Sequence, residues 1–151
     1  MRTSVTTLAI LLLGCTPMGE TPGLRLGGSS AASPGDFSFV RDHEIIQLEA
    51  RGAVLPRVVN IWGVSMDGAL YVWGDPGSGW VERVADRPDA VRVRAGEDVY
   101  ALRAAVVEDR GELERVVAAY QAKYGADLDA IFGRSATVDD FQRVYRLTPR
   151  G

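Results

Sequence analysis

Two apolar runs on either side of Asp67-Gly68 dominate the pattern of this sequence, within residues 57–74. An Asp-Gly pair between β-branched and aromatic runs is typical of a two-residue hairpin turn of type I′. Side chains alternate along a strand, so each strand contributes to two faces. One face holds Val59, Ile61, Leu70 and Val72, and the other holds Asn60, Trp62, Val64, Tyr71 and Trp73. We expect the aliphatic face to form core and Trp62 to lie opposite Trp73. The aromatic face suits the long helix of the same subunit, a second subunit or a flat ligand.

Alternation of apolar and polar positions predicts further strands on both sides of this hairpin. Residues 44–51 alternate before it, and residues 141–147 form a closing strand that Pro149 ends. Between them, residues 91–94 and 99–107 would pair around a turn centred on positions 96 and 97. That turn would place Val93 opposite Tyr100. Three arginines would then share the outer side of this second hairpin, as a solvated face or a phosphate contact: Arg92, Arg94 and Arg103.

A 3.6-residue period predicts one long helix from Asp109 to Tyr124. Asp109 is a good N-cap, Glu112 occupies the capping-box position, and Gly125 lies where a C′ glycine would end the helix. Shorter helical segments are expected at residues 37–41, 80–85 and 127–132. The order strand, hairpin, short helix, hairpin, helix, strand predicts a mainly β (α+β) domain. We expect a small split antiparallel β-barrel with two or three peripheral helices.

The N-terminus has the pattern of a signal peptide. Arg2 precedes an apolar run at residues 5–13, which is too short to span a bilayer as a helix. The run ends at Leu12-Leu13-Gly14-Cys15, which resembles the lipobox of bacterial lipoproteins. That resemblance implies cleavage before Cys15 and its lipidation, whereas the alternative is an ordinary secretory signal. We therefore expect a signal peptide at 1–14, a flexible tether at 15–35 and a barrel domain at 36–151, held outside the cytoplasm in the bacterial cell envelope.

Composition narrows the chemistry. With 151 residues and a net charge of −3, the chain is one mildly acidic domain, which argues against nucleic-acid binding. Cys15 is the only cysteine, so a lipidated Cys15 leaves no thiol for a disulfide or a metal. His43 is the only histidine, so neither a histidine-based triad nor a multi-histidine metal site can form within one chain. We expect no metal site.

Several short segments carry a family resemblance through their order and spacing. They are residues 57–62, Asp67-Gly68, residues 70–73, Gly77-Ser78-Gly79-Trp80, Pro88 before Val91-Arg92-Val93, residues 119–125 and residues 144–147. Residues 44–150 thereby resemble split β-barrel proteins that bind flavin or deazaflavin, such as the pyridoxamine-phosphate-oxidase-like and deazaflavin-dependent nitroreductase families. The resemblance implies a homodimer with FMN or a deazaflavin coenzyme between its subunits.

By position, the residues that the resemblance assigns to the coenzyme are Arg57, Asn60, Ser78, Gly79 and Arg83. Trp62 and Trp73 would stack on its ring. The start of the helix after Ser78 suits a phosphate, although a capped surface connector explains it equally well. The loop at residues 51–56 departs from the deazaflavin enzymes because it lacks their lysine and serine. Two functions remain, a lipid-tethered oxidoreductase that binds a flavin-type coenzyme and a non-catalytic envelope lipoprotein that uses the barrel as a binding module.

Overall fold

The computed structural model describes residues 21–22, 25–52 and 55–150. The predicted signal peptide and Cys15 lie outside these residues. The strands are β1 (Thr21–Pro22), β2 (Ser29–Ser30), β3 (Ile46–Arg51), β4 (Pro56–Ile61), β5 (Gly63–Met66), β6 (Ala69–Gly74), β7 (Val91–Ala95), β8 (Asp98–Val106) and β9 (Arg143–Pro149). The α-helices are α1 (Gly79–Asp86) and α2 (Arg110–Phe132), and the 3₁₀ helices are η1 (Ser38–Asp42) and η2 (Val138–Asp140).

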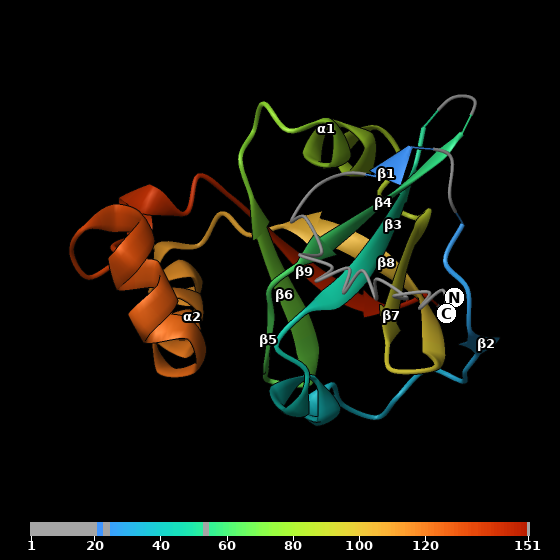
Figure 1. Cartoon of the computed structure of the whole chain (residues 1–151), viewed down its shortest axis with the longest axis horizontal. Coiled ribbons are helices and arrows are strands. Elements are labelled where there is room, and N and C mark those ends of the chain that lie inside the picture. The colour runs from blue at the N-terminus through green and yellow to red at the C-terminus, as the bar shows by residue number, and fades with distance from the viewer. Residues whose placement is uncertain (1–20, 23–24, 53–54, 151) are drawn as a thin grey trace, which may run out of the picture.

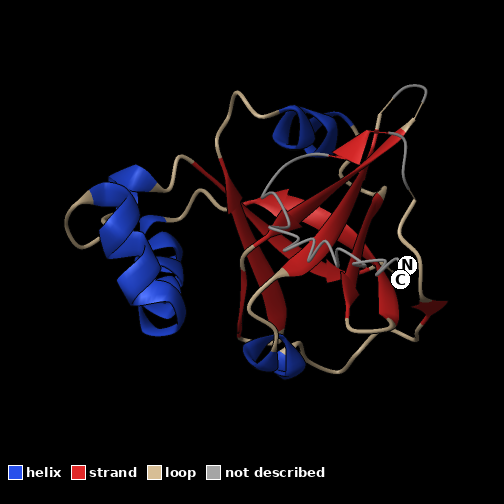
Figure 2. Cartoon of the chain, viewed as in Figure 1, coloured by secondary structure: helices blue, strands red, loops and turns tan. Residues whose placement is uncertain are grey.

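One curled sheet forms the body of the molecule, with the helices around its outside (Figures 1 and 2). Its strands follow the order β1-β4-β3-β7-β8-β9-β6-β5, with every neighbouring pair on this path antiparallel. The short β2 pairs in parallel with β8. Only Trp62 separates β4 from β5, which lie near opposite ends of this strand order, so the two ends of the sheet are connected covalently through this residue. The expected mainly β split barrel is confirmed.

The central hairpin turns where the sequence predicts. Asp67 and Gly68 have φ values of 52° and 74°, as a type I′ turn requires, and Val64 lies opposite Tyr71. The ladder stops at Gly63 opposite Val72, however, and Trp62 lies in neither strand. The predicted register is therefore confirmed and both indoles pack against the same apolar cluster, but the expected ladder pair of Trp62 with Trp73 does not form. The chain bends at Trp62 to pass from β4, paired with β3, to β5, paired with β6, and this bend takes the indole out of the ladder.

The aliphatic face fills the barrel. Its four hairpin residues join side chains from every long strand in one core cluster. The 3₁₀ helix η1 closes one end of the barrel with Val40, helped by the preceding Phe37, and both side chains are fully buried. Helix α1 closes the other end with Trp80 and Val84. The two short helices expected before β3 and after β6 are thus η1 and α1, and each closes one end of the barrel with buried side chains.

Helix α2 packs on the outside of the barrel and covers the aromatic face. A second core cluster joins Tyr71 to Tyr120, Tyr124 and Leu128 of this helix. The helix consists of two helical segments joined across a kink at Tyr124, so helical geometry is interrupted beside Gly125, where the sequence predicts the first helix to end. The short helix expected at 127–132 falls in the second segment, which ends at Phe132. Tyr124 leaves helical geometry with φ −123° and ψ 20°, but the helix resumes because the fully buried Leu128 belongs to the same apolar cluster. Gly133, with φ 68°, is the glycine that ends it.

The outer face of β4, β3, β7 and β8 is covered by the segment that precedes η1. Leu26 is buried with Val58 and Val99, and its N–H donates to Glu49 Oε2 at 2.9 Å. Sequence analysis predicts residues 15–35 as a flexible tether, whereas residues 25–31 lie against the sheet through β2 and Leu26. The three arginines of this side all have partners within the chain, and their side chains are 22% exposed at Arg92, 29% at Arg94 and 61% at Arg103. Arg92 donates to the Glu49 carboxylate, Arg94 donates to the carbonyl oxygen of Gly96, and Arg103 donates to the Asp89 carboxylate.

Candidate functional site

The predicted coenzyme-binding residues fall into three separate regions of the molecule. Ser78, Gly79 and Arg83 lie at the start of α1, near the end of the β3–β4 pair that carries Arg57. Asn60 lies on the outer face of the same pair, as the register shows by placing it opposite Gln47. Trp62 and Trp73 pack beneath α2. One subunit therefore does not assemble these residues around a single ligand.

The start of α1 gathers polar groups from two elements. Ser78 is the N-cap, but its hydroxyl donates to Asp75 O at 2.7 Å and does not cap the helix. The first N–H groups of any helix lack partners within it, and here they lie beside a guanidinium because Arg83 donates to Gly79 O at 2.5 Å. Arg83 also lies close to Gly52, since its Nε would be 3.1 Å from a Cβ built there. This corner combines helix amides with positive charge, as an anion requires.

Arg57 joins this corner from β4. It pairs with Ala50, two positions before Gly52, and it points to the same side of the sheet as Val59 and Ile61. That side is the one that α1 closes. Arg57 therefore lies on the side of the sheet that packs against α1, the helix that carries Gly79 and Arg83.

Asn60 is part of a different environment. Its Oδ1 accepts a hydrogen bond from Gln47 Nε2 at 3.2 Å. Gln47 in turn lines a depression of about 280 Å³ with Ile45, Arg94 and Gly96. The sheet separates this depression from α1, so Asn60 cannot orient a ligand bound at the start of that helix within one subunit.

The two tryptophans already have ring partners within the subunit. Trp62 stacks on Tyr124 with ring centroids 4.7 Å apart and planes 11° from parallel. Trp73 lies 4.5 Å from Phe141. Tyr120 holds the helix above them, because its hydroxyl bonds the carbonyl oxygens of Trp62 at 3.0 Å and Tyr71 at 3.2 Å. The sequence left three candidates to cover the aromatic face, namely the long helix of the same subunit, a second subunit or a flat ligand. The structure shows the helix of the same subunit in that place.

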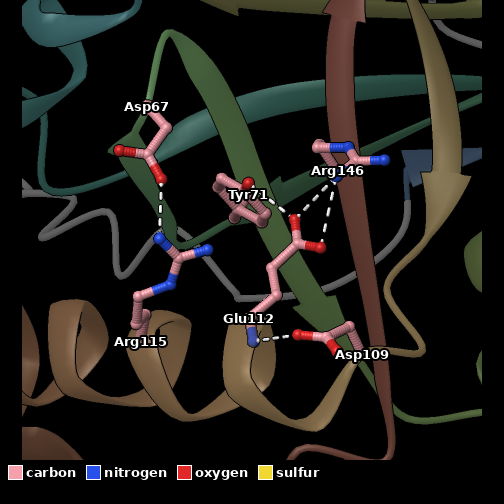
Figure 3. Close-up of polar contacts among 6 residues, drawn as sticks. All are labelled: Asp67, Tyr71, Asp109, Glu112, Arg115 and Arg146. Atoms are coloured by element: carbon pink, nitrogen blue, oxygen red, sulfur yellow. Dashed lines mark hydrogen bonds and ion pairs between the residues drawn. The ribbon is translucent and has the colours of Figure 1, made fainter.

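Figure 3 shows a polar cluster between α2 and the sheet that sequence analysis missed. The hydroxyl of Tyr71 donates to Glu112 Oε1 at 2.8 Å, and Arg146 donates to both oxygens of that carboxylate. Burial and the nearby Glu112 raise the pKa of Tyr71 to about 12. Asp109 caps the helix by accepting the Glu112 N–H at 2.7 Å, but the Glu112 side chain turns to the sheet and leaves the capping box incomplete. The cluster fastens α2 to β6 and β9.

Lys123 forms a second tie that no sequence pattern indicates. Its Nζ donates to three carbonyl oxygens, those of Val40 and His43 at 2.7 Å and of Gly63 at 2.9 Å. Burial lowers the pKa of Lys123 to about 8, while the charges of Asp42 and Glu44 act in the opposite direction. A single ammonium thus joins α2, the end of η1 and the start of β5.

No group of three or more histidine, cysteine, aspartate or glutamate side chains among the described residues is placed to hold a metal ion. In the same residues, no helix is long and apolar enough to cross a membrane.

Comparison with known proteins places the fold. No family model matches the sequence, and no curated protein matches it. Solved structures do match. The haem storage protein HutZ from Vibrio cholerae has a TM-score of 0.58 at 18% identity, over 75% of this chain and 87% of that one. A candidate pyridoxamine 5′-phosphate oxidase from Listeria innocua has a TM-score of 0.56 at 18% identity, over 74% and 88%.

An F420-H2-dependent reductase also matches, with a TM-score of 0.54 at 17% identity over 70% of this chain and 94% of the other. Another matching structure is a domain-swapped dimer. At these identities the likeness shows a shared fold, the split β-barrel. The site residues of this chain have to be judged on their own geometry.

Proposed function

We propose that this protein is a lipid-anchored protein of the bacterial cell envelope whose barrel binds a flavin-type coenzyme, FMN or a deazaflavin, as an oxidoreductase. The observation that carries the proposal is the corner at the start of α1. There a barrel of the kind found in the F420-H2-dependent reductase places Ser78, Gly79 and Arg83 beside the strand that carries Arg57. A Cys15 lipid anchor and a homodimer with the coenzyme between subunits complete the proposal.

The residues present fit the phosphate end of such a coenzyme. The first amides of α1 supply N–H donors, and the guanidinium groups of Arg57 and Arg83 supply positive charge, although Arg83 also donates to Gly79 O. The nearby Asp75 carboxylate accepts the Gly77 N–H at 2.7 Å, which fixes the loop before the helix. When bound, the coenzyme would supply hydride transfer, and the protein would bind and orient it.

The ring end does not fit the aromatic face of a single subunit. Trp62 and Trp73 pack against Tyr124 and Phe141, and α2 lies over both indoles. If the coenzyme binds at the α1 corner, its ring would therefore lie outside the aromatic face, and these tryptophans would not stack on it. Asn60 takes no part in this arrangement, because it bonds Gln47 on the other side of the sheet.

A specific observation favours a second candidate function. The α2 helix fills the aromatic face, and the loop at residues 51–56 lacks the lysine and serine of the deazaflavin enzymes. A non-catalytic envelope lipoprotein that keeps the barrel as a binding module accounts for both features. This candidate requires no coenzyme and no assembly of the predicted contacts.

The visible spectrum of protein purified from its native membranes separates the two candidates most directly. The purified protein is also titrated with FMN, a deazaflavin coenzyme and haem, with tryptophan fluorescence as the readout, since Trp80 lies in the first turn of α1. Loss of one charged phosphate contact costs about 1.5–3 kcal/mol, so Arg57→Gln and Arg83→Gln should each weaken binding about 10- to 100-fold.

Arg103→Gln is the matched control, because Arg103 is exposed and pairs with Asp89 elsewhere on the barrel. Its affinity for the coenzyme should equal that of the unmodified protein. A colourless protein that is dimeric in solution and shows no quenching by any of the three ligands would contradict the coenzyme proposal and leave the binding module.

A further inference from the structure

A groove at the opposite end of the barrel from α1 lies between η1, the edge strand β5 and helix α2. Its volume is about 350 Å³, and its lining combines two cations with small apolar surfaces: Arg41, Val64, Ser65, Ala119, Ala122 and Lys123. A smaller depression of about 100 Å³ adjoins it, because Arg41 and Ser65 line both. The groove belongs to elements that take no part in the α1 corner.

The edge of β5 offers backbone hydrogen-bonding groups to this groove. The two-residue turn makes Met66–Ala69 and Val64–Tyr71 the hydrogen-bonded pairs of the hairpin, so the N–H and C=O of Gly63 and Ser65 point away from β6. At Gly63 these groups are occupied, since the N–H bonds the Tyr124 hydroxyl at 3.2 Å and the oxygen accepts from Lys123. Ser65 lines the groove, and the register turns its N–H and C=O away from β6 in the same way.

Positive charge lies on both sides of the groove. Arg41 is exposed, and among the described residues its guanidinium makes no hydrogen bond or ion pair, although its charge helps to lower the pKa of Asp36. Lys123 presents the opposite side of the groove, where three carbonyl oxygens fix its ammonium. A ligand group placed at Ser65 would therefore meet a preformed N–H donor and a free guanidinium.

The rest of the groove is apolar. Val64 of β5 and Ala119 and Ala122 of α2 present only methyl groups, which match an alkyl chain better than a polar one. Carboxylates nearby limit the charge that the site can accept. Asp36 lines the adjoining depression, and Asp42 and Glu44 lie close enough to Lys123 to act on its pKa. A dianion such as phosphate would be repelled more strongly than a monoanion.

We propose that this groove binds a short-chain monocarboxylate, with its carboxylate between the Arg41 guanidinium and the Ser65 N–H and its alkyl chain on Val64, Ala119 and Ala122. An arginine fork matches the planar carboxylate in geometry as well as charge. For a ligand of this size we expect a dissociation constant on the order of 1 mM. The proposal does not depend on the coenzyme.

Lys123 makes the site directly observable, because it is the only lysine in the sequence. Protein labelled with ¹³C,¹⁵N-lysine gives a single Nζ signal, which is followed during titration with butyrate, butyramide and inorganic phosphate. Butyrate should shift this signal saturably, and the neutral isostere butyramide should not. The added anion should also raise the Lys123 pKa above its value of about 8 in the free protein, where Asp42, Glu44 and Arg41 are the charged groups nearby.

Variants test each half of the groove. Arg41→Gln should weaken butyrate binding about tenfold. Ala122→Asp places a negative charge on the apolar floor and should abolish binding. Ala85→Asp, at an exposed alanine of α1, is the matched control and should leave binding unchanged.

All three variants alter exposed side chains, and dispersed amide spectra verify that each one is folded. Equal responses to butyrate and butyramide would overturn the proposal. An Arg41→Gln variant whose butyrate titration has the same midpoint as that of the unmodified protein would also overturn it. Tighter binding of phosphate than of butyrate would do the same.

Discussion

At the scale of single residues, Glu49 is the side chain whose role is least expected from its type. It is fully buried, its Oε2 accepts from the Leu26 N–H at 2.9 Å, and Arg92 bonds the same oxygen at 3.1 Å. A buried carboxylate is stable only when it has such partners. Glu49 therefore fixes where the N-terminal segment meets the sheet.

Replacing this carboxylate tests its role. Glu49→Gln keeps the shape of the side chain but removes the charge, so we expect a loss of about 2–3 kcal/mol in the free energy of unfolding. Amide hydrogen exchange at residues 26–31 should accelerate more than exchange in the barrel. The measurements are urea unfolding and hydrogen exchange.

Glu97→Gln serves as the control. Its carboxylate is 87% exposed and bonds Arg94 at 3.4 Å, so its loss should change stability by less than about 0.5 kcal/mol. If Glu49→Gln matched this control and the Leu26 amide stayed protected, the carboxylate would not be what holds the segment.

At the scale of elements, α2 consists of two helical segments joined across a kink at Tyr124, and a glycine follows the end of each segment. Gly125 follows the kink at Tyr124, has no positive φ, and a Cβ there would meet only the flexible Gln121 side chain, at 3.2 Å. Gly133 adopts φ 68°, which disfavours any residue with a Cβ. The same residue type thus has opposite roles within one helix.

The two glycines predict opposite mutational effects. Gly125→Ala should stabilise the protein by up to about 1 kcal/mol, because alanine loses less backbone entropy in a helix. Gly133→Ala should destabilise it by about 1 kcal/mol, because alanine is strained in the left-handed region. Urea unfolding of the two variants gives both values, and destabilisation by both would mean that Gly125, like Gly133, is required by the backbone geometry at its position.

The seam between α2 and the barrel also predicts sensitivity to alkaline pH. Burial raises the pKa of Tyr71 and Tyr124 from 10.0 to about 12, and that of Tyr120 well above 10.0. Above pH 10.0 the unfolded chain loses these protons first, so the free energy of unfolding should fall as the pH rises to about 12. Urea unfolding across this range, with tyrosinate absorbance in parallel, measures the effect.

Single tyrosine variants identify the groups responsible. Tyr71→Phe and Tyr124→Phe should each flatten the pH dependence between 10.0 and about 12, since each removes one phenol whose pKa folding raises. An unchanged slope in both variants would mean that the seam does not govern alkaline stability.

At the scale of the whole molecule, the barrel was predictable from local signals, because the residues at each hairpin turn determine where the chain reverses. Asp67-Gly68 and Gly96-Glu97 set the two hairpins in the expected registers, and alternation identified the faces that became the interior. The segment around Leu26 could not be predicted, because one buried leucine and one buried carboxylate hold it without any periodic pattern.

The candidate site was predictable only in part, for the same reason. Ser78, Gly79 and Arg83 lie within six residues of one helix start, so a local pattern could group them. Trp62 and Asn60 are near neighbours in sequence, but the bend after β4 sends one beneath α2 and leaves the other beside Gln47. Which face a helix covers depends on contacts between distant segments, and the sequence alone does not report them.

The proposed anchor sets where this molecule would reside. One acyl chain gives only marginal membrane binding at about 0.8 kcal/mol per buried CH₂, whereas the two or three chains of a lipoprotein hold firmly. Five residues lie between Cys15 and Thr21, where β1 pairs with β4, so the six Cα–Cα steps from Cys15 to Thr21 reach at most about 20 Å. We predict that Cys15→Ser leaves an uncleaved precursor or releases the protein from membranes.

The measurement is membrane fractionation, with mass spectrometry of the mature N-terminus. A mature chain with an unmodified Cys15 would contradict the anchor, and a variant that stays on membranes after cleavage would mean that another part of the molecule holds it there.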